Sequence, residues 1–263
     1  KSMKLKVYCV IDGSHYESKD SIRFRSVSIQ LPYIEEWENV ACFDIKRNEN
    51  NNEILIKYKK TDSVMLYKSK EFNLEIIHLQ KGLWFSEVQK EVHLKQSSFL
   101  EITCLADKSF GTYSRILFHL LNLFSFIAMK PLLPIEVRAI DENSSFAFPI
   151  WIYYPIKSSL NFKPIFRLSL LFTLYDIKEI SQQVFENWFR KRDLLKPVFN
   201  LYFCTFYDSE MYLEHRFLCL VQALESYHRR TKKNSDLLQE LHKERITVIL
   251  NSVPSEHKDW LRE

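Results

Sequence analysis

The sequence predicts an α+β protein: an N-terminal antiparallel β-sandwich-like domain with a packed helix, followed by an α-helical bundle portion. Three observations support this fold class. Apolar and polar residues alternate with a period of two through much of residues 1–105, as they do in half-buried strands. A segment with helical period follows at 113–129, and beyond about residue 170 the apolar spacing is three or four.

The strands are predicted from alternation in 53–59 and 71–79. In 22–31 the apolar positions change phase, which a β-bulge near Arg25 or Ser26 would explain. Many short antiparallel strands with one polar face are typical of a sandwich.

The first helix is predicted over 113–129 and is expected to pack across the sheet. It stops at Lys130-Pro131, because proline cannot continue a helix. Its apolar stripe consists of Ile116, Leu120, Leu123, Phe124 and Ile127.

The C-terminal part is predicted to be helical. Asp176 with Glu179 has the spacing of a capping box. The strongest helical pattern covers 209–230, and another helix is expected over about 236–250. The apolar positions of the strongest helix are Leu213, Phe217, Leu220, Val221, Leu224 and Tyr227.

Two domains are predicted, 1–160 and 161–263, joined by a proline-containing stretch at 155–164. The first residues already have a strand pattern and the last ones stop inside a helical pattern. We therefore expect the sequence to be an internal piece of a longer protein.

Composition excludes several common enzyme classes. The three glycines, at 13, 82 and 111, are too far apart for a dinucleotide-binding, P-loop or nucleophile-elbow motif. Five cysteines without a C-x-x-C pair indicate buried thiols in a reducing compartment. No segment has the length and apolarity of a membrane span, so we expect a cytoplasmic protein without membrane contact. The net charge of +4 permits contact with phosphates but does not require it.

The candidate site lies in 224–230. Glu225 and Arg229 are four residues apart on the predicted helix, and Glu225 and His228 are three apart. An acid, an imidazole and a guanidinium can therefore meet beside the apolar stripe, where they could bind a phosphate. The alternative is a surface ion pair followed by a basic run that the helix dipole favours.

Other polar patterns are weaker. His215 and Cys219 have i,i+4 spacing, but no second pair completes a metal site, and no metal or other cofactor is predicted. A cysteine–histidine nucleophile pair stays open, because such partners are distant in sequence. Basic residues mix with aromatic ones at 57–60 and 190–192, as in single-strand nucleic-acid binders, but charges that protect edges and surfaces give the same pattern.

The sequence resembles the bacterial ApeA-type proteins, which join a β-rich ApeA N-terminal domain to a HEPN domain. The segment 212–230 is similar to that family's helix built around FLxLVQALExYHRR. Weaker similarity covers most of the remaining chain, at 12–16, 22–31, 36–37, 175–189 and 195–198.

The resemblance implies an abortive-infection anti-phage defence protein. In such a protein the N-terminal domain senses a phage protein trigger, and the HEPN domain cleaves RNA, tRNA included. HEPN ribonucleases pair an R-x4-6-H motif from each subunit, which implies a homodimer through the C-terminal half. Arginine would hold the scissile phosphate and histidine would move protons by metal-independent acid/base chemistry, without a cofactor.

The sequence departs from this pattern, because no arginine is followed by a histidine five to seven residues later; Arg115 and His119 come nearest. We expect the motif on a later helix. In this chain the resemblance then assigns supporting catalytic roles to Glu225 and His228, and RNA or phosphate binding to His228, Arg229 and Arg230.

Two rival functions remain open. The chain could be a non-catalytic interaction or dimerisation module that binds a protein partner. Alternatively, the β-rich part could bind carbohydrate, which needs an exposed aromatic platform drawn from Trp37, Trp84 and Trp151.

Overall fold

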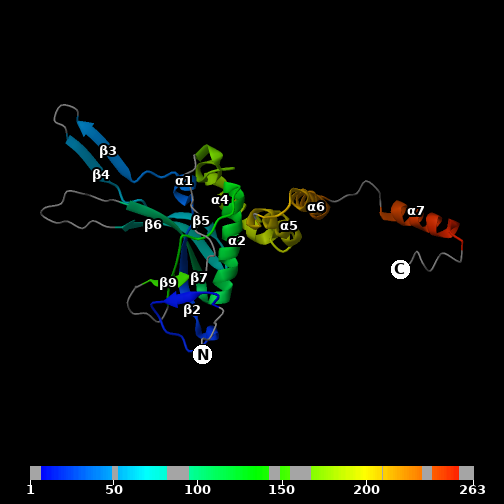
Figure 1. Ribbon diagram of the computed structural model, residues 1–263, viewed down its shortest axis with the longest axis horizontal. Coiled ribbons are helices and arrows are strands. Elements are labelled where there is room, and N and C mark those ends of the chain that lie inside the picture. Colours follow the sequence, from blue (N-terminus) through cyan, green and yellow to red (C-terminus); the bar gives the residue numbers. More distant parts are fainter. Residues whose placement is uncertain are drawn as a thin grey trace. The chain divides into compact units, whose positions relative to one another are not determined.

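The computed structural model describes residues 7–48, 53–81, 95–141, 149–154, 167–208, 210–232 and 239–254 (Figure 1). The chain divides into two compact units, Lys1–Lys191 and Arg192–Glu263. Among the described residues, all strands belong to the first unit. The predicted α+β class, with strands first and helices after, is confirmed. The predicted domain division at 160/161 and the connection at 155–164 lie outside the described residues.

Seven antiparallel strands of the described residues form one sheet, in the order β1-β9-β8-β2-β7-β6-β5. The pairing of β2 with β7 shifts register between Phe24 and Ser26, so the predicted β-bulge is confirmed. The strand bounds are β1 Val10–Asp12, β2 Arg23–Gln30, β5 Val64–Lys68, β6 Phe72–Lys81, β7 Lys95–Ser109, β8 Glu136–Ile140 and β9 Ile150–Tyr153.

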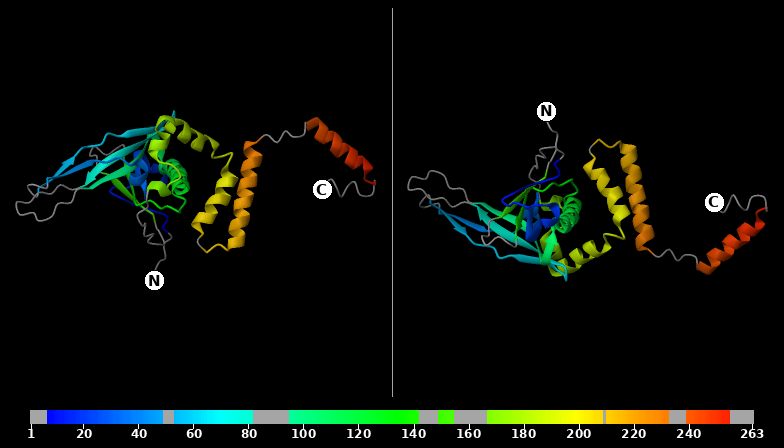
Figure 2. Two further views of the ribbon diagram at one scale, coloured as in Figure 1. Left: turned by 90° about the horizontal axis from the view of Figure 1, so that it is seen from above. Right: turned by 90° about the horizontal axis from the view of Figure 1, so that it is seen from below.

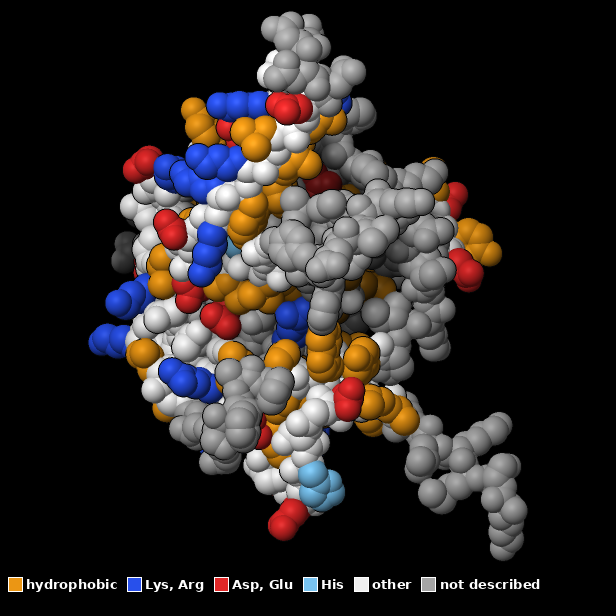
Figure 3. Space-filling model, turned by 90° about the vertical axis from the view of Figure 1, so that its left-hand side faces the viewer, with side chains coloured by type: hydrophobic (Ala, Val, Ile, Leu, Met, Phe, Trp, Pro, Cys, Tyr) orange, Lys and Arg blue, Asp and Glu red, His pale blue; other side chains and the backbone are white. Residues whose placement is uncertain are grey.

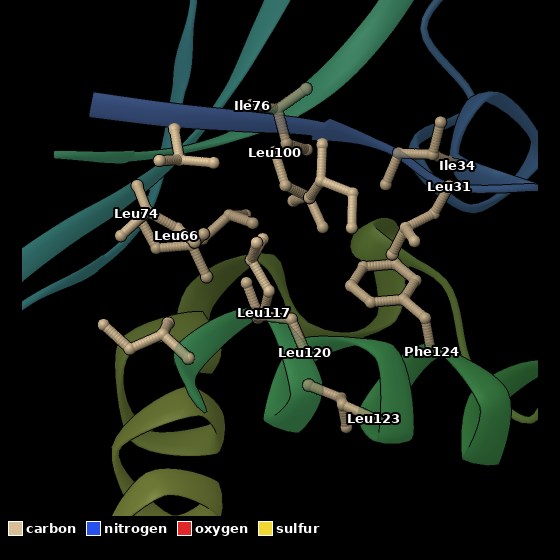
Figure 4. Packing of buried hydrophobic residues seen from close by; sticks show 14 of the residues in the cluster. Leu31, Ile34, Leu66, Leu74, Ile76, Leu100, Leu117, Leu120, Leu123 and Phe124 are labelled. Carbon is tan, nitrogen blue, oxygen red and sulfur yellow. The ribbon is translucent and has the colours of Figure 1, made fainter. Parts of the chain in front are cut away.

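Helix α2 (Phe110–Ala128) covers one face of this sheet. Figure 4 shows Leu117, Leu120 and Phe124 of α2 beside strand residues such as Leu74 and Leu100. The five residues of the predicted stripe are each at most 5% exposed, which confirms the predicted packing. The second layer of the first unit, which packs against the seven-stranded sheet, is therefore helix α2. The sequence predicted a sandwich-like arrangement with a packed helix.

The ends of α2 follow from local chemistry. Its N-cap is Ser109, and its first residue, Phe110, stands three residues before the predicted start at 113. Met129 ends the helix with a left-handed backbone (φ 49°), directly before the predicted Lys130-Pro131 stop.

Short helices complete the first unit. They are η1 Lys19–Ser21, α1 Ile34–Glu38, η2 Arg167–Ser169, α3 Leu174–Ile177, η3 Lys178–Ile180 and α4 Ser181–Lys191. Helix α4 docks on the edge strand β5, where the Gln182 side chain accepts from the Lys68 N–H (2.8 Å) and donates to its carbonyl (3.0 Å). The Phe189 ring also lies against Tyr67 and Phe72. These contacts explain why α4 belongs to the first unit.

The predicted capping box is displaced by three residues. The Thr173 N–H and hydroxyl both donate to Asp176 Oδ2 at 2.7 Å, so Thr173 is the N-cap of α3 and Asp176 stands at N3. The prediction that Asp176 opens the box with Glu179 is therefore wrong. Asp176 faces back toward Thr173, which supplies two donors to its carboxylate.

Strands β3 (Phe43–Asn48) and β4 (Glu53–Tyr58) form a separate two-stranded hairpin in the first unit. The hairpin extends beyond the seven-stranded sheet (Figures 1 and 2). At its base, the Tyr58 hydroxyl donates to Gln96 Oε1 of β7 at 3.3 Å.

The second unit contains α5 (Lys196–Tyr207), α6 (Leu213–Thr231) and α7 (Gln239–Ser252) among its described residues. Helices α5 and α6 pack side by side in both views of Figure 2. Helix α6 confirms that a helix follows residue 209, but it begins at Leu213, four residues after the predicted start, and ends at Thr231, one residue after the predicted end. Helix α7 starts three residues after the predicted position and ends two residues later than predicted, and Asp236 lies outside the described residues.

Two further expectations can be compared with the described residues. No helix there combines the length and apolarity that crossing a bilayer requires. All five cysteines are free, but only Cys104 is buried, whereas the other four are partly exposed.

Candidate functional site

Helix α6 carries the four predicted site residues in its last two turns. Glu225 Oε1 lies 2.6 Å from Arg229 Nη2, so the predicted i,i+4 pair forms. The side chains are 55% exposed for Glu225 and 73% exposed for Arg229. Water screens such a pair, which contributes only about 0.3–0.5 kcal/mol to stability. Glu225 is therefore accessible to a ligand and is not a buried structural charge.

Arg230 has a structural contact that sequence reasoning did not foresee. Its Nη1 donates to the Leu194 carbonyl at 3.2 Å, two residues before α5 begins. The side chain thus links the end of α6 to the start of α5. A guanidinium has five N–H donors, so this bond leaves donors for a phosphate.

His228 is exposed on the same turns as Glu225. Among the hydrogen bonds of the described residues, Glu225 pairs with Arg229 and not with His228. The predicted meeting of three groups is thus realised for the acid and the guanidinium. The imidazole lies nearby in sequence on the basic end of α6, where the last turn contains His228, Arg229 and Arg230. A cationic last turn suits the negative end of the helix dipole and could attract a phosphate backbone.

A long apolar surface runs along α6. We call it the α6 apolar surface; its exposed members are Leu213, Phe217, Leu218, Val221, Leu224 and Tyr227. Leu213 is 75% exposed and Leu224 is 70% exposed, whereas Ala223 is the buried residue of this helix. Neighbouring helix α5 therefore covers a different, narrower strip of α6.

His215 and Cys219, whose i,i+4 spacing was considered in the sequence, do not form a metal site among the described residues. The His215 ring lies edge-on to Tyr212, with ring centroids 6.3 Å apart. Cys219 instead contacts the Cys204 thiol of α5, and burial followed by this contact raises the pKa of Cys204. No cluster of three or more histidine, cysteine or acidic side chains within the described residues could hold a metal ion.

The tryptophan platform required for the carbohydrate-binding alternative does not form as expected. Trp37 is only 1% exposed and lies in the core. Trp151 is half-buried, with the Arg138 guanidinium 4.5 Å from its ring centroid. Trp84 lies outside the described residues.

Sequence reasoning missed two polar groups in the first unit. His78 Nε2 pairs with Glu38 Oε1, and both side chains are almost completely buried. Glu101 accepts bonds from the hydroxyls of Ser26 (3.3 Å) and Ser28 (3.2 Å), and burial raises the pKa of its carboxyl. In these interactions each residue is 40 to 75 positions from its partner in the sequence, so no local sequence pattern could have identified them.

Comparisons with known proteins agree with this organisation. The family described as ApeA N-terminal domain 1 matches residues 1–188, and the family described as Apea-like HEPN matches residues 218–263. No curated protein and no solved structure matches the chain significantly. The HEPN match includes most of α6 and all four predicted site residues. Because the first match covers most of the sequence, the chain belongs to the ApeA-type anti-phage defence proteins, with an ApeA N-terminal domain followed by an Apea-like HEPN segment.

Proposed function

We propose that this protein stops phage propagation by cleaving RNA in the infected cell. The observation that carries the proposal is the presence of an ApeA N-terminal domain and a HEPN segment in one chain. The β-rich part, assigned to residues 1–160, senses a phage protein trigger in the cytoplasm. The helical part, assigned to 161–263, contributes to RNA cleavage, with tRNA among the candidate substrates. No cofactor takes part.

The proposed chemistry is metal-independent proton transfer. An arginine holds the scissile phosphate, and a histidine acts on the 2′-hydroxyl or on the leaving oxygen. Residues 1–263 contain no R-x4-6-H motif, and we propose that this pair lies outside them. Glu225 and His228 support that pair, and Arg229 and Arg230 hold the RNA phosphates.

The exposed geometry of α6 supports these roles. Glu225 and Arg229 are solvated, and an incoming phosphate can compete with the carboxylate for the guanidinium, because both groups present two anionic oxygens that a guanidinium can bind together. The Leu194 bond holds the Arg230 side chain near the start of α5 before RNA arrives. The proposed site therefore has one adaptable and one positioned arginine.

The test uses the protein expressed from its own gene in phage-challenged bacteria and in RNA-cleavage assays. Glu225→Gln and His228→Ala should each abolish protection and cleavage while changing the melting temperature little. Glu214→Gln, an exposed acid in the first turn of α6, is the matched control and should keep both activities. Normal cleavage by both site variants would remove Glu225 and His228 from the site.

The second candidate function is a non-catalytic interaction or dimerisation module. The α6 apolar surface favours it, because such an exposed surface commonly marks a protein interface. The same assays on the protein expressed from its own gene distinguish the two functions. A protein that protects cells against phage but leaves total RNA intact, with and without EDTA, would support the interaction module and contradict the nuclease.

A further inference from the structure

The β3–β4 hairpin has one mainly apolar face, which also carries Arg47, and one mainly polar face, which also carries Leu55. The register pairs Ile45 with Ile56 and Phe43 with Tyr58, so these side chains lie on one face together with Ile54. Ile45, Ile54 and Ile56 are 60%, 61% and 47% exposed. A two-stranded hairpin is marginally stable alone, and a further strand or an apolar cover stabilises it.

The outer edge of β4 is open among the described strands, because the hairpin sheet consists of β3 and β4. The Lys59 N–H donates to the Cys42 carbonyl at 2.8 Å, which sets the phase of the antiparallel ladder. Alternation then directs the N–H and C=O groups of Ile54 and Ile56 away from β3. A further strand can bond to these groups while its side chains meet the exposed isoleucines.

The positive charge of the hairpin favours an acidic strand as its partner. Residues 43–60 contain five basic and three acidic residues, and Lys57, Lys59 and Lys60 lie on β4 or directly after it. In the upper part of Figure 3, Lys and Arg side chains lie beside hydrophobic ones. A second copy of this hairpin would bring like charges together, whereas an acidic segment would neutralise them.

The aromatic side chains disfavour single-stranded RNA as the occupant. Phe43 and Tyr58 are partly buried against each other, with ring centroids 5.4 Å apart, and the Tyr58 hydroxyl bonds to Gln96. The most exposed large side chains on this face are aliphatic, and RNA binders of this kind need free aromatic rings for stacking. The basic run at 57–60 therefore fits a protein partner better.

We propose that the β3–β4 hairpin binds a protein segment with alternating acidic and aliphatic side chains, which adds to the outer edge of β4 as a third strand. This inference depends on the proposed sensing function in one respect: that function identifies the bound segment as part of a phage protein. Recognition combines backbone bonds to β4, apolar contact with Ile54 and Ile56, and attraction to the lysines.

The experiment measures binding of synthetic peptides to the 263-residue chain by fluorescence anisotropy, with hydrogen exchange to locate the site. The probe is a seven-residue peptide of alternating Glu and Val. The controls are the same peptide with Lys in place of Glu, and a twelve-nucleotide oligo(U). The acidic peptide should bind at least tenfold more tightly than either control and should protect the amides of 53–58.

Two variants test the proposed contacts separately. Ile56→Pro removes one N–H that points away from β3, at an edge where proline is tolerated. The variant should bind the acidic peptide at least tenfold more weakly. Lys57→Glu with Lys59→Glu should reverse the preference toward the basic peptide. Lys178→Glu, an exposed charge reversal on η3, should leave binding unchanged. Circular dichroism checks that each variant folds.

Several results would overturn the inference. These are equal binding of both peptides, protection outside the hairpin, tighter binding of oligo(U), or no saturable binding of the acidic peptide. The assay involves neither infection nor RNA cleavage. Failure of the nuclease proposal would therefore leave its result intact, and a negative result here would leave the nuclease proposal intact.

Discussion

The Tyr113 hydroxyl of α2 lies 2.7 Å from the Arg25 carbonyl oxygen and 3.1 Å from that of Phe24. Both carbonyls are at the bulge of β2, where the ladder with β7 changes register. A bulge leaves backbone groups without ladder partners. The tyrosine therefore supplies a donor that connects the covering helix to the irregular point of the sheet.

Tyr113→Phe should destabilise the protein by about 1–2 kcal/mol, because it leaves the buried Phe24 carbonyl and the partly buried Arg25 carbonyl without this donor while keeping the ring in place. Urea denaturation monitored by circular dichroism measures the loss. Tyr175→Phe is the control, since Tyr175 is 77% exposed and should change stability little. An equal, small effect of both changes would show that the Tyr113 bond contributes nothing.

Asp176 should contribute a pH-dependent part of stability. Hydrogen bonds from the Thr173 side chain and backbone lower the pKa of Asp176 below its ordinary value of 3.8. A lowered pKa means that the stabilisation is present above the unfolded value and is lost as pH falls through the folded one. Melting curves from pH 6 to pH 2.5 should show that Asp176→Asn flattens the acid branch. An acid branch identical to the wild type would contradict this expectation.

Glu101 should make stability change with pH in the opposite direction to Asp176. Burial first, and then repulsion from Glu75, raise the pKa of its carboxyl, while the bonds from Ser28 and Ser26 oppose the rise. The folded protein therefore favours the protonated acid, and stability falls as pH rises from the unfolded value near 4.5 through the higher folded value.

Glu101→Gln keeps an oxygen for the serine hydroxyls but does not ionise. The variant should lose less stability than the wild type between pH 4 and pH 7, as measured by thermal melts. Glu71→Gln, at an exposed position, is the control and should follow the wild-type curve. Parallel curves for Glu101→Gln and wild type would show that the carboxyl is not penalised by burial.

Local periodicity was sufficient to predict the elements whose burial is regular. The phase change at Arg25 identified the bulge, and the three-four spacing around Leu120 identified the buried face of α2. The α3 cap was predicted wrongly, because the Asp176–Glu179 spacing matched the motif while Thr173, three residues earlier, offered the better donor.

The candidate site was only partly predictable. The Glu225–Arg229 pair depends on helical spacing alone, so sequence could identify it. The Arg230 bond to Leu194 and the Glu38–His78 pair depend on how distant segments pack, which no single-sequence period encodes.

The α6 apolar surface makes a specific prediction about assembly. Four of its members, Leu213, Phe217, Leu224 and Tyr227, together with the half-buried Leu220, follow the four-three spacing of a coiled-coil seam, and the 19-residue helix is roughly 28 Å long. We expect the protein expressed from its own gene to form a homodimer through its C-terminal half. Phe217→Glu combined with Leu224→Glu should convert the dimer to a monomer and abolish RNA cleavage.

The substitutions are at positions that are 64% and 70% exposed, so each subunit should stay folded and the change should act on the interface. Light scattering after size exclusion gives the mass, and circular dichroism checks folding. Leu168→Glu is the control, because Leu168 is 97% exposed in the first unit and should leave the dimer intact. A wild-type monomer that still cleaves RNA would rule out the shared site. A double variant that stays dimeric would place the interface elsewhere, because two buried carboxylates facing their symmetry mates could not be accommodated in the seam.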